Sequence, residues 1–166
     1  MTKVGLISDT HSYFDPKLNE YFIDRDEIWH AGDFGSVAVA ESLQKIADLK
    51  GVYGNIDGTE IRKMFPKQLT FEREGVSFWI THIGGTYKRY CVPIREEMDN
   101  NPPDVFICGH SHILKIGRDK EKNNMLYINP GAAGKHGFHE KRTCIRFDID
   151  AGKLKNMEVI EMGGRT

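Results

Sequence analysis

The sequence predicts an α/β fold in which an alternating first part is followed by a second part rich in strands. Short apolar runs of strand length recur along the first two thirds of the chain, and polar residues follow each run at once. Helical periodicity lies between some of these runs, whereas apolar and polar residues alternate after about residue 113. With 166 residues, a single domain over 1–166 can enclose a core without disulfides or a structural metal.

The elements follow from these patterns in chain order. Five early strands are expected at the apolar runs KVGLIS, EIWHAG, LKGVYG, VSFWIT and DVFICG. Between them, Ser36 can cap a helix that runs to about Asp48, and Asp57 or Thr59 can cap a shorter one. In CIRFDID apolar residues alternate with polar ones, which predicts an antiparallel strand, and the turn DAGK leads from it into a last strand, LKNMEVIEM.

Composition excludes several classes of protein. Lys and Arg (23) are interleaved with Asp and Glu (24) for a net charge of -1, so nucleic acid is not an expected partner. No basic leader or long apolar segment is present, so neither export nor membrane insertion is expected. The three cysteines, Cys91, Cys108 and Cys144, are far apart and odd in number, which fits free thiols and a cytoplasmic location.

The loops after the early strands all carry residues that can bind a metal. These candidates are Asp9, His11, Asp33, Asn55, His82, His110 and His112. Loops at the carboxyl ends of strands in open α/β sheets converge, so the candidates are expected to meet. Carboxylates and neutral imidazoles bind first-row divalent metals, and a paired-metal site with surplus positive charge suits phosphate chemistry. His30, two positions before the GDF motif, is expected to be a buried packing histidine rather than a ligand.

In order and in kind, these residues resemble the five motifs of the calcineurin-like metallophosphoesterases, which read here as Asp9-x-His11, Gly32-Asp33, Gly54-Asn55, His82 and Gly109-His110-x-His112. The short chain, the Gly-Asn loop without a following histidine and the NPG at 129–131 resemble the small single-domain phosphodiesterase branch of that family. That branch is similar to the scaffold subunit of the retromer complex.

The resemblance implies a two-sheet αββα sandwich with a dinuclear metal site at the carboxyl ends of the strands. It implies two divalent ions per chain, with Mn²⁺ expected first and Ni²⁺, Zn²⁺, Fe or Mg²⁺ as alternatives. One ion would be held by Asp9, His11 and His112. The other would be held by Asn55, His82 and His110, and Asp33 would bridge the two. If the segment at 110–112 is extended, both histidines share one face and Ser111 points away.

The implied activity is that of a metal-dependent phosphoesterase, in particular a phosphodiesterase acting on a small phosphate ester. A metal-bridging hydroxide would attack phosphorus, while Asp33, Asn55 and His110 hold this water and position the phosphate. Association of identical chains is left open. The alternative is a non-catalytic, metal-binding scaffold for protein interactions, although a bare scaffold gives no reason for neutral imidazoles to converge. A nuclease for short oligonucleotides is a third interpretation, weakened by the lack of surplus basic charge.

One departure from the family pattern concerns the general acid. The family motif Gly-Asn-His-Asp reads Gly-Asn-Ile-Asp here, and Ile56 cannot donate a proton to the leaving group. His136 and His139, in a loop rich in Gly and Ala, are the candidate replacements, although a surface hairpin with solvated charges is the simpler interpretation of that loop. Without an assigned acid, diesters with acidic phenol leaving groups are expected to react faster than those with alkyl ones.

Overall fold

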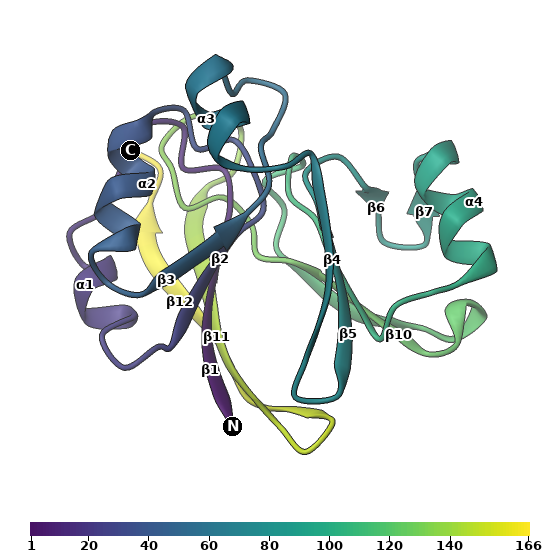
Figure 1. Cartoon of the computed structure of the whole chain (residues 1–166). Helices are drawn as coiled ribbons and strands as arrows, with labels where there is room; N and C mark the ends of the chain where they lie inside the picture. The colour runs from purple at the N-terminus through teal and green to yellow at the C-terminus, as the bar shows by residue number, and fades with distance from the viewer.

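Two five-stranded sheets pack face to face in the computed structural model, which describes residues 1–166 (Figure 1). In spatial order, the first sheet consists of β12 (Lys153–Gly164), β11 (Lys141–Asp150), β1 (Thr2–Ile7), β2 (Glu27–His30) and β3 (Asp48–Gly51). The second consists of β4 (Gln68–Arg73), β5 (Val76–Thr81), β8 (Val105–Ile107), β10 (Met125–Asn129) and β9 (Lys115–Asp119). A separate small sheet pairs β6 (Gly85–Thr86) with β7 (Arg89–Tyr90). The helices are α1 (Leu18–Tyr21), α2 (Val37–Gln44), α3 (Thr59–Met64), α4 (Val92–Asn100) and the 3-10 turn η1 (Lys120–Lys122).

The main core fills the space between the two sheets. In β1, Leu6 points into this core, whereas its neighbour Ile7 packs with Leu43 of α2 on the outer face of the first sheet. On the outer face of the second sheet, Trp79 of β5 packs with Met98 of α4. Figure 1 shows α1 and α2 outside one sheet and α4 outside the other. The order helix, sheet, sheet, helix confirms the predicted αββα sandwich.

Parallel pairing places the ends of the key strands side by side. In the first sheet, β1, β2 and β3 run parallel, with Ile7 opposite His30 and His30 opposite Gly51. In the second sheet, β5 runs parallel to β8, with Ile80 opposite Ile107. The loops that follow these five strands therefore emerge at one end of the sandwich. None of the helices has the length and apolarity that a bilayer span requires.

Several local expectations were wrong. The first long helix, α2, ends at Gln44 rather than near Asp48, because Asp48 already begins β3. Ser36 is its N-cap residue, but its side chain makes no capping hydrogen bond. Asp57 does not cap α3, whose N-cap residue is Gly58. The strand β4 had no counterpart among the expected elements.

The end of the chain follows the predicted pattern closely. β11 and β12 pair antiparallel, and the turn between them consists of Ala151 and Gly152, with φ of 49° and 77°. Positive φ at both central residues is the geometry that joins neighbouring antiparallel strands without splaying them. By contrast, β10 pairs parallel with β8 on one side and antiparallel with β9 on the other. The second half is thus rich in strands, as expected, but not purely antiparallel.

Candidate metal centre

The metal-binding candidates lie on loops that turn sharply as they leave the strands. Five of the seven candidate residues have left-handed backbone conformations, with φ between 44° and 70°: Asp9, His11, Asp33, His110 and His112. Non-glycine residues rarely adopt such angles, and each costs on the order of 1–3 kcal/mol unless the surroundings impose it. Backbone strain is therefore concentrated where the five loops meet.

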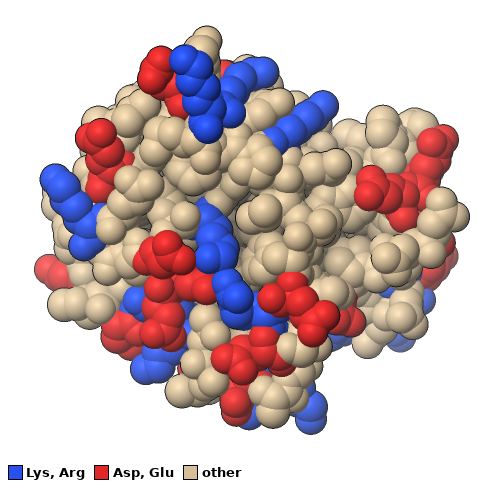
Figure 2. All heavy atoms as spheres, viewed as in Figure 1, with Lys and Arg blue, Asp and Glu red and all other residues tan.

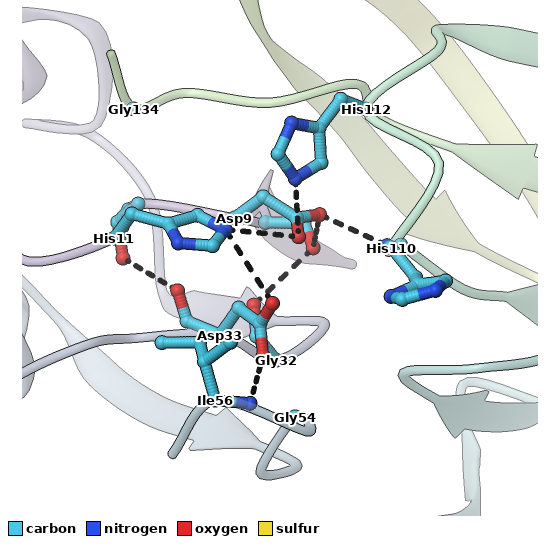
Figure 3. A network of polar contacts seen from close by, with 12 residues as sticks. Asp9, His11, Gly32, Asp33, Gly54, Ile56, His110, His112 and Gly134 are labelled. Carbon is cyan, nitrogen blue, oxygen red and sulfur yellow. Dashed lines mark hydrogen bonds and ion pairs between the residues drawn. The ribbon is translucent and has the colours of Figure 1, made fainter. Parts of the chain in front are cut away.

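Six of these side chains form two adjacent groups. Within each group the potential ligand atoms lie within 4.8 Å of one another; the groups are Asp9, His11 and His112, and Asp33, His82 and His110. In the first, the Nε2 atom of His112 is 3.2 Å from Oδ1 of Asp9 (Figure 3). In the second, the Nε2 atom of His82 is 3.2 Å from Oδ2 of Asp33.

Asp33 also contacts the first group. Its Oδ2 atom is 3.4 Å from Nε2 of His11 (Figure 3). The same oxygen is 3.2 Å from Nε2 of His82, so it lies between an imidazole of each group. Oδ1 of Asp9 is 3.7 Å from Nε2 of His11 and 3.8 Å from Nε2 of His82. The position of Asp33 suits a carboxylate that contacts two neighbouring cations.

Three ligand atoms in this cluster are buried and have no hydrogen-bond partner: Oδ1 of Asp9, Nε2 of His11 and Nε2 of His82. Leaving a buried polar atom unpaired costs on the order of 1–3 kcal/mol, so native structures rarely contain several together. One kind of partner, a cation, would satisfy a carboxylate oxygen and two imidazole nitrogens at once. The residues present therefore fit divalent metal ions.

Hydrogen bonds hold three of the candidate ligands, Asp9, Asp33 and His82, by the atom that does not face the cluster. Nδ1–H of His82 donates to the carbonyl oxygen of Ala31 at 2.8 Å, which leaves the lone pair on Nε2. Oδ2 of Asp9 accepts from the Ser8 hydroxyl at 2.7 Å and from the backbone N–H of His110 at 3.1 Å. Oδ1 of Asp33 accepts from the backbone N–H of Ile56 at 3.1 Å. Such outer contacts are typical of metal sites.

The electrostatics of the cluster favour added positive charge. Burial opposes ionisation of Asp9, but its contacts with His11 and His112 outweigh this and hold its pKa well below the usual range. The pKa of Asp33 is also lowered, because His82 outweighs the effect of burial. Burial alone would lower the pKa of His82, yet Asp33 and Asp9 raise it. Two buried carboxylates thus draw positive charge into the cluster.

His110 and His112 reach different groups, but not through an extended segment. Both have left-handed φ, of 70° and 62°, and the N–H of Ser111 donates back to the carbonyl of Gly109 at 2.9 Å. The ring of His110 lies against His82, with centroids 5.3 Å apart, whereas His112 lies 5.2 Å from His11. A tight turn, rather than strand alternation, separates the two imidazoles, so the extended geometry was wrong.

Asn55 lies beside the second group. It is exposed on the loop after β3 and lines a pocket of about 280 Å³ together with His82. The same pocket contains Arg62 and Lys67, which the motifs did not point to. Both are basic residues in the short segment after the Gly-Asn motif, a position that could have drawn attention to them.

The structure places the two candidate acids, His136 and His139, against the first ligand group. The ring of His136 lies 4.9 Å from that of His11, and the ring of His139 lies 5.1 Å from that of His112. His136 is exposed, whereas Nε2–H of His139 donates to the carbonyl of Gly134 at 2.8 Å and its Nδ1 is buried. The loop that carries them is therefore more than a solvated hairpin, since it packs against the candidate ligands.

Asp57 has a role that sequence reasoning missed. Its carboxylate accepts from three backbone N–H groups, those of Phe34 at 3.2 Å, Gly35 at 2.8 Å and Gly54 at 2.8 Å. It therefore ties the loop of Asp33 to the Gly-Asn loop. His30, as expected, is a fully buried packing residue: it stacks on Phe34, and its Nδ1 accepts from the N–H of Gly32 at 3.1 Å.

Comparisons with known proteins agree with this architecture. A probable metallophosphoesterase of Methanothermobacter thermautotrophicus is 32% identical over 169 residues, which cover 96% of this chain and 92% of that protein. A solved archaeal phosphodiesterase superposes with a TM-score of 0.72 at 24% identity, covering 95% of this chain and 99% of that one. Vps29 of Entamoeba histolytica, solved in complex with Zn²⁺, superposes with a TM-score of 0.73 at 13% identity, covering 99% of both chains. At these identities the two superpositions show a shared fold.

Family membership rests on the sequence match. Residues 2–152 match the calcineurin-like phosphoesterase superfamily domain, which spans all the loops that carry the candidate ligands. That family typically binds divalent metals, and the two ligand groups of this chain lie inside the matched region. The chain therefore belongs to the calcineurin-like phosphoesterase superfamily.

Proposed function

We propose that this member of the phosphoesterase superfamily is a phosphodiesterase that uses two divalent ions. The observation that carries the proposal is the set of three buried, unpartnered ligand atoms on Asp9, His11 and His82. A protein that bound no cation would leave these atoms unsatisfied at a cost in stability. Mn²⁺ is the first choice of ion, with Ni²⁺, Zn²⁺, Fe or Mg²⁺ as alternatives.

The ligand assignment follows the two groups. Asp9, His11 and His112 would hold one ion, and Asn55, His82 and His110 the other. Asp33 would contact both, which its Oδ2 atom supports by lying 3.4 Å from His11 and 3.2 Å from His82. When bound, paired ions lower the pKa of a water molecule and offset the negative charge that develops on the phosphoryl oxygens.

The remaining chemistry belongs to side chains of this protein. Asn55 and His110 are exposed at the edge of the cluster, where they can orient a phosphate. Ile56 is 47% exposed beside Asp33 and offers no proton. His136 is better placed than His139 to protonate a leaving group, because Nε2 of His139 is already bonded to Gly134 and its Nδ1 is buried.

A direct assay tests the proposal. The purified protein is stripped with a chelator, reloaded with each metal in turn, and supplied with an aryl phosphodiester or the matching aryl phosphomonoester. We expect hydrolysis to return with metal and to favour the diester. Asp33→Ala should abolish it, whereas Asp48→Ala, which removes an exposed carboxylate at the start of β3, should not.

The same assay distinguishes a phosphodiesterase from the alternative, a non-catalytic scaffold. The structural likeness to Vps29 supports a non-catalytic, metal-binding scaffold as the second candidate. Tight binding of ions without hydrolysis of either ester, with any metal, would favour the scaffold. Preference for the monoester would retain the hydrolase and reject the diesterase.

A further inference from the structure

The pocket next to the second ligand group opens beside the candidate metal centre. Its lining includes Asn55 from the loop after β3 and His82 from the loop after β5. An ester phosphate held at the centre would therefore have one of its substituents at the mouth of this pocket. The volume of about 280 Å³ lies just below the usual range for ligand sites, which suits a compact group rather than a large ring system.

The charges in this pocket are all of one sign. Arg62 and Lys67 line it, and no acidic residue does. The ion pairs of the chain use other basic residues, and neither Arg62 nor Lys67 takes part in one. In Figure 2 basic side chains lie at the top of the view, over α3 and the segment before β4, with acidic side chains beside them. Glu60, the acidic residue of α3, is not part of the lining.

Arg62 is held in place without forming an ion pair with a carboxylate. Its Nε–H donates to the carbonyl oxygen of Asp57 at 2.7 Å, and its guanidinium lies over the ring of Tyr53, 4.5 Å from the centroid. The contact with Asp57 uses only one of its five N–H groups, so the terminal nitrogens are left to bind an anion. An oriented guanidinium beside an ammonium is a common way of binding phosphate.

We infer that this pocket, defined by Tyr53, Arg62 and Lys67, binds a second phosphoryl group of the substrate. That group would be carried by the ester substituent that stays bonded to phosphorus after hydrolysis. The inference rests on the proposed phosphodiesterase function. His136, the candidate acid, contacts His11 of the first ligand group, whereas the pocket borders His82 of the second. The leaving group is thus assigned to the side of His136, and the retained, negatively charged substituent to the pocket.

A matched series of diesters tests this assignment. All members carry p-nitrophenol as leaving group, and the other arm is ethyl, carboxyethyl, phosphonoethyl or phosphonopropyl. A phosphonate mimics the dianion of a phosphate but cannot itself be hydrolysed. We expect kcat/KM to be about tenfold higher for the better phosphonate than for the ethyl ester, with the carboxylate between them, and the difference to shrink in high salt.

Single substitutions locate the effect. Lys67→Ala should remove most of the preference for the phosphonate esters over the ethyl ester, and Lys67→Arg should restore that preference. Lys63→Ala is the matched control, because Lys63 is an exposed lysine of α3, next to Arg62, that does not line the pocket. Equal rates for ethyl and phosphonate esters, or equal loss in Lys63→Ala, would overturn the inference.

A binding measurement keeps this test separate from the proposed function. Ethylphosphonate is titrated into the metal-free protein, and chemical shifts of backbone amides near Tyr53 and Arg62 are followed by NMR. We expect saturable shifts that are lost in Lys67→Ala and kept in Lys63→Ala. If these shifts occur and no ester is hydrolysed, the inferred phosphoryl-binding pocket is supported and the phosphodiesterase proposal is rejected. If esters are hydrolysed without preference and no shifts appear, only the pocket fails.

Discussion

His82 and Ala31 are joined by a hydrogen bond of 2.8 Å, in which Nδ1–H of the imidazole donates to the backbone carbonyl. The bond links the loop after β5 in the second sheet to the loop after β2 in the first, and it turns Nε2 of His82 toward Asp33. Next to Ala31, Gly32 has φ of 101°, and a Cβ there would lie 2.5 Å from Nδ1 of His82. Close contact across the two sheets therefore requires glycine at this position.

Gly32→Ala should lower kcat/KM for an aryl phosphodiester by about 100-fold, because displacement of a catalytic group by about 1 Å costs that much. The change strains the backbone and pushes His82 away from Asp33, so affinity for Mn²⁺ should fall with activity. Gly58→Ala is the control, since a Cβ there would meet nothing within 4 Å. Kinetics and metal titration of both variants check the prediction, and wild-type activity in Gly32→Ala would refute it.

Asp57→Ala should destabilise the metal-free protein by about 3 kcal/mol, because it leaves three backbone N–H groups, two of them buried, without an acceptor. Asp57→Asn keeps one acceptor oxygen, so its free energy of unfolding should fall by about half as much. Denaturant unfolding in the presence of a chelator measures the free energy of unfolding without any contribution from bound ions. Equal stability of the alanine variant and the wild type would show that Asp57 does not hold these loops together.

Stability at acid pH should depend on His30. Burial lowers its pKa from 6.5 to about 3. Between about pH 3 and pH 6.5, His30 is therefore protonated in the unfolded chain but neutral in the folded one. Each unit of pH below about 6.5 should then lower the free energy of unfolding by about 1.4 kcal/mol through this residue. In His30→Gln, the slope measured by denaturant unfolding of metal-free protein should be shallower by that amount. Identical slopes would contradict the prediction.

Ile56→His should restore a proton donor of the kind the family motif carries. Ile56 is 47% exposed beside Asp33, so an imidazole there has room and access. We expect the rate for diesters with poorly acidic leaving groups to rise at least about tenfold, within the usual contribution of a general acid. In contrast, His136→Ala should slow those same esters and steepen the dependence of rate on leaving-group pKa.

A series of phenyl and alkyl esters measures both effects, with His139→Ala for comparison. If His136→Ala left the dependence on leaving-group pKa unchanged, His136 would not be the acid. The phenolic esters should respond least to either change, since their leaving groups need little protonation.

The positions of the loops that carry the candidate ligands were predictable because each lies directly after a short apolar run. Parallel pairing then brings such loops together whatever the details of the turns, and Asp9 and His82 lie near one another in spite of their separation in sequence. The layered fold was predictable for a similar reason, since strands such as β1 and β5 alternate between the inner and outer faces of their sheets.

Features imposed by distant contacts were not predictable. The left-handed turn at His110 goes with a hydrogen bond from its N–H to Asp9, about a hundred residues earlier in the chain. Asp57 seemed a helix cap because nothing local shows that Phe34 and Gly54 would both present N–H groups to it. Arg62 and Lys67 follow the Gly-Asn motif closely, but nothing in the sequence shows that this segment comes to lie beside the end of β5 and forms a basic pocket there.

Titration of activity against bound metal tests the central claim most directly. Metal-free protein receives Mn²⁺ in steps, and the ions bound per chain and the kcat/KM for an aryl phosphodiester are measured at each step. Our account predicts that two ions bind per chain and that hydrolysis rises with occupancy, reaching its maximum when both positions are filled. Two bound ions without hydrolysis, or full hydrolysis by the metal-free protein, would contradict it.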